Sequence, residues 1–300
     1  MSGARRKRVM RSILPILTVV AAIVLLWYGA AVSMNAKWAQ DQAARANVEL
    51  SLTELVADAW SQERPRLPAP HQVFAELWKS TGEMALKGRA FSKRSLIFHG
   101  WITLSATMLG FVIGTGAGIL LAVGIVHYRV MDMSVMPWAI ASQTIPILAI
   151  APMIIVVLNS IGIQGLVPKA IISAYLSFFP VVVGMVKGLR SPSMDQLDLL
   201  RTYNAGGNAT FWKLRLPSSM PYLFTSLKIG MAASLVGAIV GELPTGAIRG
   251  LGARMLTGSY YGQTIQIWAA LFAAAILAAV LVGIIGLIER SILKRMGMSQ

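Results

Sequence analysis

The sequence holds few side chains that could carry out covalent chemistry. It has no cysteine, so it offers no thiolate nucleophile, no thiolate metal ligand and no disulfide. Its three histidines, His71, His99 and His127, are scattered and show no metal-ligand spacing. The dipeptide Gly-Lys never occurs, so the sequence has no phosphate-binding loop of the nucleotide-binding kind. We therefore predict no catalytic residue, no metal site and no cofactor bound by this chain, and a protein that is not an enzyme.

Polar residues inside apolar segments are the next candidates, because an ionisable group at membrane depth indicates a function by default. Glu242 and Lys228 are the ionisable ones, and both lie near the ends of such segments. Lys228 can carry its amine to the membrane surface on its long apolar stem. For Glu242, a gating role and a purely structural role both stay open. The residues that we predict to belong to a translocation pathway are Gln143, Thr144, Ser234 and Glu242.

The polar stretch 187–218 has a spacing that predicts two short helices joined by a sharp turn. Ser193 with Gln196 is a capping-box pattern, which predicts a helix that begins at about Met194. The residues from Asn204 onward should end this helix, and Asn208 can cap a second one. Pro217 and Pro221 should precede the next apolar segment.

The first of these helices would be amphipathic. Its apolar face carries Leu197, Leu200 and Tyr203, and the opposite face carries Asp195, Asp198, Arg201 and Thr202. A helix this short needs a partner surface in water, and an anionic membrane surface would repel its two aspartates. The pattern favours docking on another protein, while an ordinary solvated loop stays open as the alternative.

The elements that carry these residues are membrane spans. Hydrophobic residues make up 56% of the chain and charged residues only 13%, whereas soluble domains carry about 25% charged residues. Uncharged runs at 101–128, 133–168, 170–186 and 255–288 are long enough to cross a bilayer. The sequence therefore predicts an all-α, polytopic membrane protein.

We predict six transmembrane helices in this chain. They are Ile13–Val32, Trp101–Val126, Met133–Leu158, Ala170–Val186 with a kink at Pro180, Tyr222–Leu243 and Ile265–Ile288. The first is longer than the apolar region of a secretory signal, which spans about 7–15 residues. An uncleaved anchor is therefore favoured over a signal peptide.

The basic residues set the predicted orientation. A net charge of +15 is compatible with nucleic-acid binding, but the basic residues flank the spans, which indicates membrane topology instead. Both termini are predicted to be cytoplasmic. The chain then divides into a cytoplasmic start with the first span (1–33), a periplasmic segment (34–98), a five-helix core (99–289) and a basic cytoplasmic tail (290–300).

The periplasmic segment holds seven of the twelve acidic residues. Amphipathic spacing predicts a helix over Val48–Trp60 and a second one over His71–Leu86, with Pro65, Pro68 and Pro70 between them. In the second helix, one face carries Val73, Phe74, Leu77 and Trp78. We expect this helix to lie on the membrane surface ahead of the second span.

The run Asp198-Leu-Leu-Arg-Thr-Tyr-Asn-Ala-Gly-Gly-Asn-Ala-Thr-Phe-Trp-Lys-Leu-Arg-Leu-Pro217 resembles the cytoplasmic "E-A-A" loop of ABC importer permeases. Asp198 stands at the glutamate of that motif, Leu199 and Leu200 at its two alanines, and Asn204 at its glycine. The spacing matches throughout. Asp198 keeps the acidic character of the first position, whereas Leu199, Leu200 and Asn204 differ from the motif. The residues that the resemblance assigns to coupling with an ATPase are Asp198, Leu199, Leu200, Arg201, Asn204, Ala205, Gly206, Leu214, Leu216 and Pro217.

Further segments resemble the nitrate/sulfonate/taurine subgroup of these permeases, which includes permeases for thiamine precursors and riboflavin. They are Leu67–Phe74, Ser142–Pro152 and Val236–Glu242, in that order. The resemblance implies the type I importer fold and a bacterial inner-membrane location. It also implies a second permease copy or paralogue, cytoplasmic ATPase subunits that bind ATP and Mg²⁺, and a periplasmic solute-binding protein. The solute would be a sulfonate-, taurine- or nitrate-like anion, or a pyrimidine- or flavin-like heterocycle.

Two other classes of function remain as alternatives. A secondary transporter or channel needs no ATPase partner, but it normally carries coupling charges inside its spans. An intramembrane enzyme needs paired catalytic groups, and no such motif occurs. Neighbouring reading frames for an ATPase and an exported binding protein would distinguish the importer from both.

Overall fold

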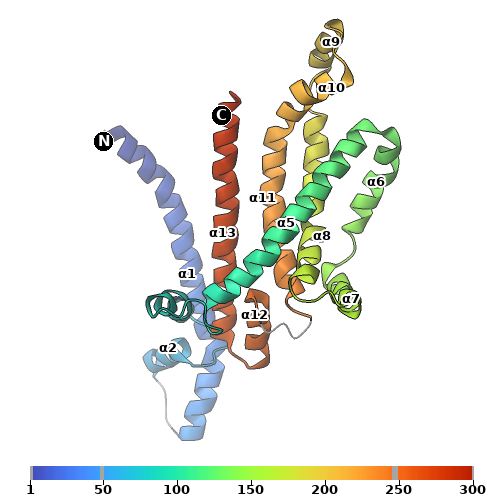
Figure 1. Ribbon diagram of the computed structural model, residues 1–300. Coiled ribbons are helices and arrows are strands. Elements are labelled where there is room, and N and C mark those ends of the chain that lie inside the picture. The colour runs from blue at the N-terminus through green and yellow to red at the C-terminus, as the bar shows by residue number, and fades with distance from the viewer. Residues whose placement is uncertain (1–2, 48–50, 245–248, 299–300) are drawn as a thin grey trace. The chain divides into compact units, whose positions relative to one another are not determined.

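The computed structural model describes residues 3–47, 51–244 and 249–298, with side chains from residue 14 onward, except Ala46. Every regular element in these ranges is a helix. The elements are α1 (Gly3–Ala46), α2 (Leu52–Ser61), α3 (Pro70–Trp78), the π-helix η1 (Lys79–Glu83), α4 (Met84–Leu86), α5 (Leu96–His127), α6 (Arg129–Ser142), α7 (Ile147–Ser160), α8 (Leu166–Leu189), α9 (Met194–Thr202), α10 (Gly207–Thr210), the π-helix η2 (Phe211–Arg215), α11 (Leu216–Gly241), α12 (Leu251–Tyr260) and α13 (Thr264–Arg295) (Figure 1).

The described residues contain five helices that are long and apolar enough to cross a membrane, or six if the bent pair α6–α7 counts as one span. The spans are Leu14–Arg45, Leu96–His127, Leu166–Leu189, Gly207–Gly241 and Thr264–Arg295. The prediction of an all-α polytopic protein is thus confirmed, and each predicted span has a helical counterpart.

The chain divides into two compact units. Unit 1 contains residues 1–96 and 255–272, and unit 2 contains residues 97–254 and 273–300. Their boundary near residue 97 lies close to the predicted boundary at 98, whereas the inclusion of residues 255–272 in the N-terminal unit has no counterpart in the sequence prediction.

Unit 1 is organised around the buried side chain of Asn35 on α1. Its amide nitrogen donates to the carbonyls of Ala59 (3.0 Å) and Leu67 (2.8 Å). Its oxygen accepts from the backbone N–H groups of Arg66 (2.9 Å) and Leu67 (3.2 Å). One side chain therefore satisfies four backbone groups and fixes the proline-containing connection between α2 and α3 against α1.

The predicted helices of this unit are present with shifted bounds. Ser51 caps α2 with a capping box, while residues 48–50, the first part of the predicted Val48–Trp60 helix, lie outside the described residues. The predicted His71–Leu86 helix is continuous but contains the π-turn η1. The prediction that Val73, Phe74, Leu77 and Trp78 form one face of this helix was wrong. Val73 is 3% exposed, whereas Phe74 is 71% exposed and Trp78 58% exposed, because these two point away from the packed side of the helix.

Unit 2 is built on the close packing of α5, α8 and α11. Added Cβ atoms at Gly110, Gly114 and Gly118 of α5 would lie within 3.0 Å of α8 atoms. These glycines recur every fourth residue, so they form one face of α5. The backbones of the two helices therefore approach closely, as small residues permit in membranes.

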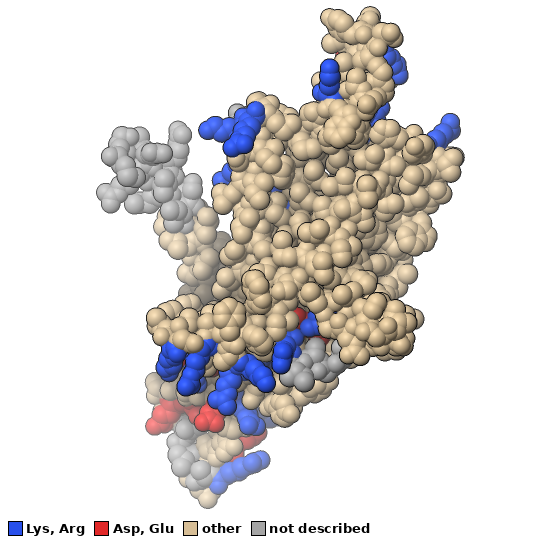
Figure 2. Space-filling view, viewed as in Figure 1, with Lys and Arg blue, Asp and Glu red and all other residues tan. Residues whose placement is uncertain are grey.

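The two ends of unit 2 carry different segments of the chain. Figure 1 shows α9, α10, the turn from α5 into α6 and the end of α13 toward one end, and α7 with the start of α8 at the other. Figure 2 shows Lys and Arg side chains at the α9–α10 end beside a broad uncharged surface, and further Lys and Arg side chains in the lower part of the view. Segments predicted to be cytoplasmic thus share one end.

The third span differs from its prediction as one helix over Met133–Leu158. It is broken at residues 143–146 into α6 and α7, which meet at an angle of 99°. Pro146 has no N–H to donate to the carbonyl of Ser142 four residues earlier. The hydroxyl of Tyr175 on α8 donates to that carbonyl instead, so the break leaves it satisfied.

Candidate functional site

The first candidate site is the segment from Ser193 to Pro217, which we call the coupling element. Ser193 and Gln196 form the predicted capping box, with Gln196 N donating to Ser193 Oγ (3.4 Å) and Ser193 N to Gln196 Oε1 (3.1 Å). These bonds satisfy backbone groups that the start of α9 would otherwise leave unpaired. The helix begins at Met194 as the spacing predicts.

The sharp turn after α9 depends on Asn204. Its φ is +52°, in the left-handed region that asparagine tolerates better than most residues. Its N–H donates to the carbonyl of Arg201 (2.9 Å), and the N–H of Ala205 to that of Leu200 (2.9 Å). The asparagine therefore supports a turn at the position where the motif has glycine.

The second helix of the element differs from its prediction. It begins at Gly207, with Gly206 as its N-cap, and not after Asn208. It also does not end before the next span, because α10, η2 and α11 run on as one helical segment from Gly207 to Gly241.

The prolines after this helix explain how it continues. Pro217 is the second residue of α11, which directly follows η2, and it has no N–H to continue the helical bonding there. Just before it, the N–H of Leu216 bonds to the carbonyl of Phe211 in a π-turn. Helix α11 thus begins six residues before the predicted span Tyr222–Leu243. Pro217 and Pro221 lie inside α11 instead of preceding it.

The exposed surface of α9 is only partly the predicted one. Tyr203 is 78% exposed and Leu199 is 57% exposed, whereas Leu197 and Leu200 are half-buried. Asp198 and Arg201 form an exposed ion pair at 2.8 Å. The surface offered to a partner therefore combines apolar side chains with a charge pair.

The inner side of the coupling element faces the end of α5 across a pocket of about 370 Å³. The pocket is lined by Val126, His127, Leu197, Arg201, Ala205, Gly207, Thr210, Phe211 and Arg215. The rings of His127 and Phe211 meet edge to face at 5.2 Å between centroids. Of the remaining predicted residues, Leu216 packs against the apolar cluster of α5 and α8, and Leu214 and Pro217 are half-buried.

Two of the predicted pathway residues lie at the break between α6 and α7. Gln143 is half-buried and Thr144 is exposed. Irregular backbone at membrane depth occurs only where it is buried in protein or lines a water-filled cavity. A third, Ser234, is fully buried. Its Oγ lies 2.6 Å from Ser173 Oγ and donates to the carbonyl of Thr107 (2.8 Å), so it joins α11 to α8 and α5.

Glu242, the residue after α11, occupies a fully buried position. Its carboxylate accepts from Thr103 Oγ1 (3.0 and 3.1 Å) and from the N–H of Gly252 (2.8 Å), and Lys169 Nζ lies 3.8 Å away. A Cβ at Gly250 would lie 2.1 Å from the carboxyl carbon, so only glycine fits beside it.

The group around Glu242 holds the start of α12. Three successive backbone N–H groups, of residues 250, 251 and 252, donate to His99 Nδ1 (3.0 Å), Thr103 Oγ1 (2.9 Å) and Glu242 Oε2 (2.8 Å). Helix N-termini leave such groups unpaired and favour a negative charge. Glu242 thus ties α5, α8, α11 and α12 together at one end of unit 2.

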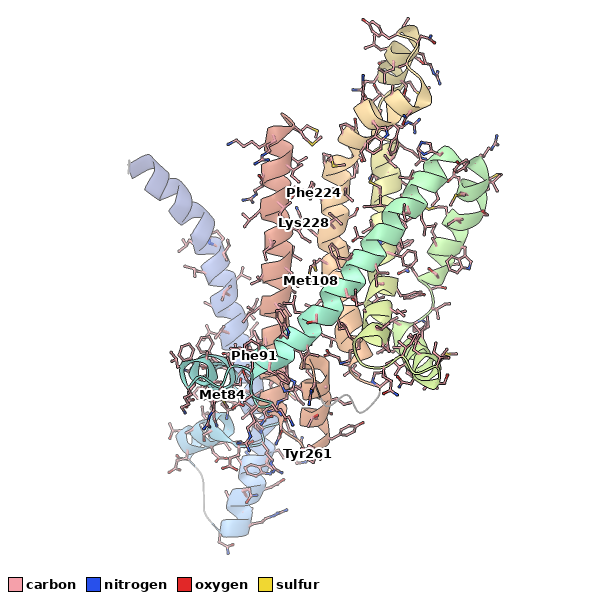
Figure 3. All side chains as sticks on the ribbon, in the orientation of Figure 1. Met84, Phe91, Met108, Phe224, Lys228 and Tyr261 are labelled. Atoms are coloured by element: carbon pink, nitrogen blue, oxygen red, sulfur yellow. The ribbon has the colours of Figure 1, made fainter. Side chains whose placement is uncertain are left out.

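Sequence reasoning missed the partners of these charged residues. Thr103 lies 139 positions from Glu242, and no local spacing signals such a pair. Lys228 pairs with Glu289 on α13. The prediction that it lies near the end of a span was wrong, because Lys228 is in the middle of α11 and its charge is neutralised by a neighbouring helix. Figure 3 shows Lys228 and Phe224 on successive turns of α11.

Comparison with known proteins shows which family this chain belongs to. Residues 114–297 match the family described as binding-protein-dependent transport system inner membrane component. The chain is 30% identical to the riboflavin transport system permease protein RibX of Chloroflexus aurantiacus, over 76% of this chain and 80% of that protein. It is 33% identical to the formylaminopyrimidine transport permease protein ThiX of Halalkalibacterium halodurans, over 54% of this chain and 65% of that protein.

A more distant relative is the putative aliphatic sulfonates transport permease protein SsuC of Bacillus subtilis, which is 24% identical over 71% of this chain and 73% of that protein. The predicted resemblance to the nitrate/sulfonate/taurine subgroup is confirmed. The match to the family model spans more than half of the chain. The chain therefore belongs to the family of binding-protein-dependent transport system inner membrane components and is a permease subunit of the ABC importer type.

Proposed function

We propose that this chain and a second permease subunit form the translocation pathway of an ATP-driven importer in a bacterial inner membrane. Cytoplasmic ATPase subunits would bind ATP and Mg²⁺, and a periplasmic binding protein would deliver the solute. The family assignment supports this assembly. The chain itself would carry out no covalent chemistry, and both of its termini would be cytoplasmic.

The observation that carries the proposal is the continuity of the coupling element with a membrane span. The exposed surface of α9 is joined through one turn at Asn204 to the helical segment Gly207–Gly241. Closure of the ATPase subunits on ATP would displace α9. Because no flexible loop separates α10 from α11, the displacement would pass directly into the span and shift the chain between inward-open and outward-open states.

The substrate class follows from the relatives. The two compared proteins with identities of 30% or more are named for riboflavin and formylaminopyrimidine, and a more distant one for aliphatic sulfonates. We propose a heterocycle of the pyrimidine or flavin type, or a sulfonate-, taurine- or nitrate-like anion. Stimulation of ATP hydrolysis by each solute, in the reconstituted complex with its binding protein, decides between them.

Gln143 and Thr144 are the residues that we propose to contact the solute. They lie at the α6–α7 break, where transporters commonly place binding groups in discontinuous helices. Ser234 and Glu242 are buried among their own helices. For these two we propose a role in joining the helices that line the pathway.

Replacement of Asp198 by Lys tests the docking surface. It should reduce recovery of the ATPase with the permease and reduce uptake in vesicles, because a cation replaces the carboxylate on the exposed side of α9. Membrane insertion should not change. Full retention of both ATPase recovery and uptake would contradict the assignment.

A charge-swapped variant separates docking from helix stability. Asp198→Arg combined with Arg201→Asp keeps the ion pair within α9 but exchanges its two charges. If the partner reads the charge at position 198, the swapped variant should remain impaired. Recovery of ATPase binding and uptake by the swap would show that the pair only stabilises the helix.

A further inference from the structure

The segment between α2 and α5 has one packed side and one exposed apolar side within unit 1. It comprises α3, η1, α4 and the residues up to Arg94, and we call it the surface segment. On its packed side, Val73 is 3% exposed and Ser80 7% exposed. The carbonyl of Ser80 accepts from the hydroxyl of Ser95 (3.3 Å), which ties η1 to the residue that follows the segment.

Large apolar side chains are exposed along the whole segment. Phe74 is 71% exposed, Trp78 58%, Leu86 81% and Phe91 69%. Figure 3 marks Phe91 and the neighbouring Met84 in this segment. Exposed apolar groups of this size cost about 25 cal/mol for each Å² left in water. Apolar side chains that cluster on a surface mark contact with a protein or a membrane.

Trp78 is held in place along its own helix. A Cβ on Gly82 would lie 2.7 Å from the indole ring, so the ring packs against the glycine one turn later, where a larger residue would displace it. The ring is thereby oriented. A pre-oriented indole is suited to the headgroup level of a bilayer, where tryptophan is enriched.

Basic residues accompany these apolar side chains and outnumber the two acidic residues of the segment, Glu76 and Glu83. Lys79, Lys87, Arg89, Lys93 and Arg94 are all exposed, and Glu83 is the only acidic residue between positions 79 and 94. Lys87 pairs with Glu83 and lowers the pKa of that carboxyl, so the pair stays ionised and has no net charge at neutral pH. The segment therefore presents an excess of cations beside an apolar surface.

The position of the segment in the chain identifies what covers it. Only Ser95 separates Arg94 from Leu96, where the candidate span α5 begins. Phe91 is five residues before that start, within about 18 Å even in a fully extended chain. The end of the segment is therefore confined to the membrane–water boundary, where apolar side chains meet acyl chains and cations meet phosphate groups.

We propose that the surface segment is a binding surface for anionic phospholipids. Phe74, Trp78, Leu86 and Phe91 insert below the headgroups. Lys79, Arg89, Lys93 and Arg94, the basic side chains other than the paired Lys87, bind lipid phosphates. If both termini are cytoplasmic, as the proposed function requires, the lipids belong to the outer leaflet. The lipid contact itself does not depend on transport.

The absence of cysteine from the sequence allows a direct depth measurement. Phe74→Cys and the exposed reference Glu63→Cys, each in the full-length chain, are labelled with a nitroxide and reconstituted in vesicles of phosphatidylcholine and phosphatidylglycerol. Collision of the label with oxygen is compared with its collision with a water-soluble nickel complex. The ratio of oxygen to nickel collisions should be several-fold higher at position 74 than at position 63.

The same ratio tests the charge preference. At position 74 it should rise when phosphatidylglycerol replaces part of the phosphatidylcholine. Replacing Lys79, Arg89, Lys93 and Arg94 by Gln should abolish that rise. The control Arg64→Gln with Arg66→Gln, which removes exposed charges from the α2–α3 connection of the same unit, should leave it unchanged.

Three results would overturn the proposal. Equal, water-like ratios at positions 74 and 63 would show that the apolar side faces solvent. A label at 74 that neither reagent reaches would show that a protein covers it. A rise with phosphatidylglycerol that survives the four Gln replacements would show that the cations bind no lipid. Loss of uptake with an unchanged depth ratio would concern the proposed function alone.

Discussion

Glu242 illustrates what a single buried side chain can fix in a membrane protein. Its carboxylate accepts from a hydroxyl of α5 and from the first turn of α12, beside the amine of Lys169 on α8. A buried carboxylate is tolerated only when such partners replace water. The residue therefore holds elements that are distant in sequence, whatever else it does during transport.

Glu242→Gln should weaken this junction. In one orientation the amide nitrogen of Gln would face Gly252 N, and in the other it would face the amine of Lys169, so one donor would lose its acceptor, at a cost of about 1–3 kcal/mol. We expect a lower unfolding temperature in detergent and slower uptake. Thr103→Val should act in the same direction, whereas Thr103→Ser keeps the hydroxyl and should not. Wild-type stability and uptake of Glu242→Gln would contradict the positioning role.

At the scale of elements, the packing of α5 on α8 sets how tightly the core of unit 2 is held. The face of α5 with Gly110, Gly114 and Gly118 contacts α8, whereas Gly116 points into open space. Gly114 and Gly116 lie on the same helix but differ in whether α8 packs against them, so the same replacement at both positions tests the packing.

Gly114→Ala should destabilise the protein. The new Cβ would lie 2.2 Å from Ser177 Oγ and 2.8 Å from the carbonyl of Ala174, so the helices would have to separate. Gly116→Ala meets nothing within 4 Å and should be neutral or stabilising, because alanine is the better helix former by about 1 kcal/mol. Thermal unfolding of the two variants in the same detergent measures the difference, and equal unfolding temperatures would argue against close packing.

Local signals were predictable and distant ones were not. The capping box at Ser193, the turn at Asn204 and the span sequences are set by neighbours within a few positions. The break at residues 143–146 was missed because the uncharged run 133–168 continues through it. The carbonyl that Pro146 leaves without a backbone donor is satisfied by Tyr175 from another helix. The sequence also did not show that Leu197 and Leu200 are half-buried while Leu199 is exposed, because this depends on what α9 packs against.

At the scale of the whole molecule, the arrangement of basic segments predicts the orientation in the membrane. Cysteines introduced at Arg5 and Met298 should react with a membrane-impermeant maleimide only after the inner membrane is opened, because both termini are predicted to be cytoplasmic. A cysteine at Glu63 should react in cells whose outer membrane alone is permeable. The reverse pattern would overturn the predicted topology.

The continuity of the segment Gly207–Gly241 has a mechanical consequence. Its 35 residues correspond to a rod about 52 Å long at 1.5 Å per residue, and the carboxylate of Glu242 lies immediately beyond its far end. A displacement of the turn at Asn204 would move this helix largely as one rigid body. The π-turn η2 lies near the displaced end and is the place where the helix can bend. Stiffness, more than any single contact, would then determine how much of each nucleotide-driven stroke reaches the opposite face of the membrane.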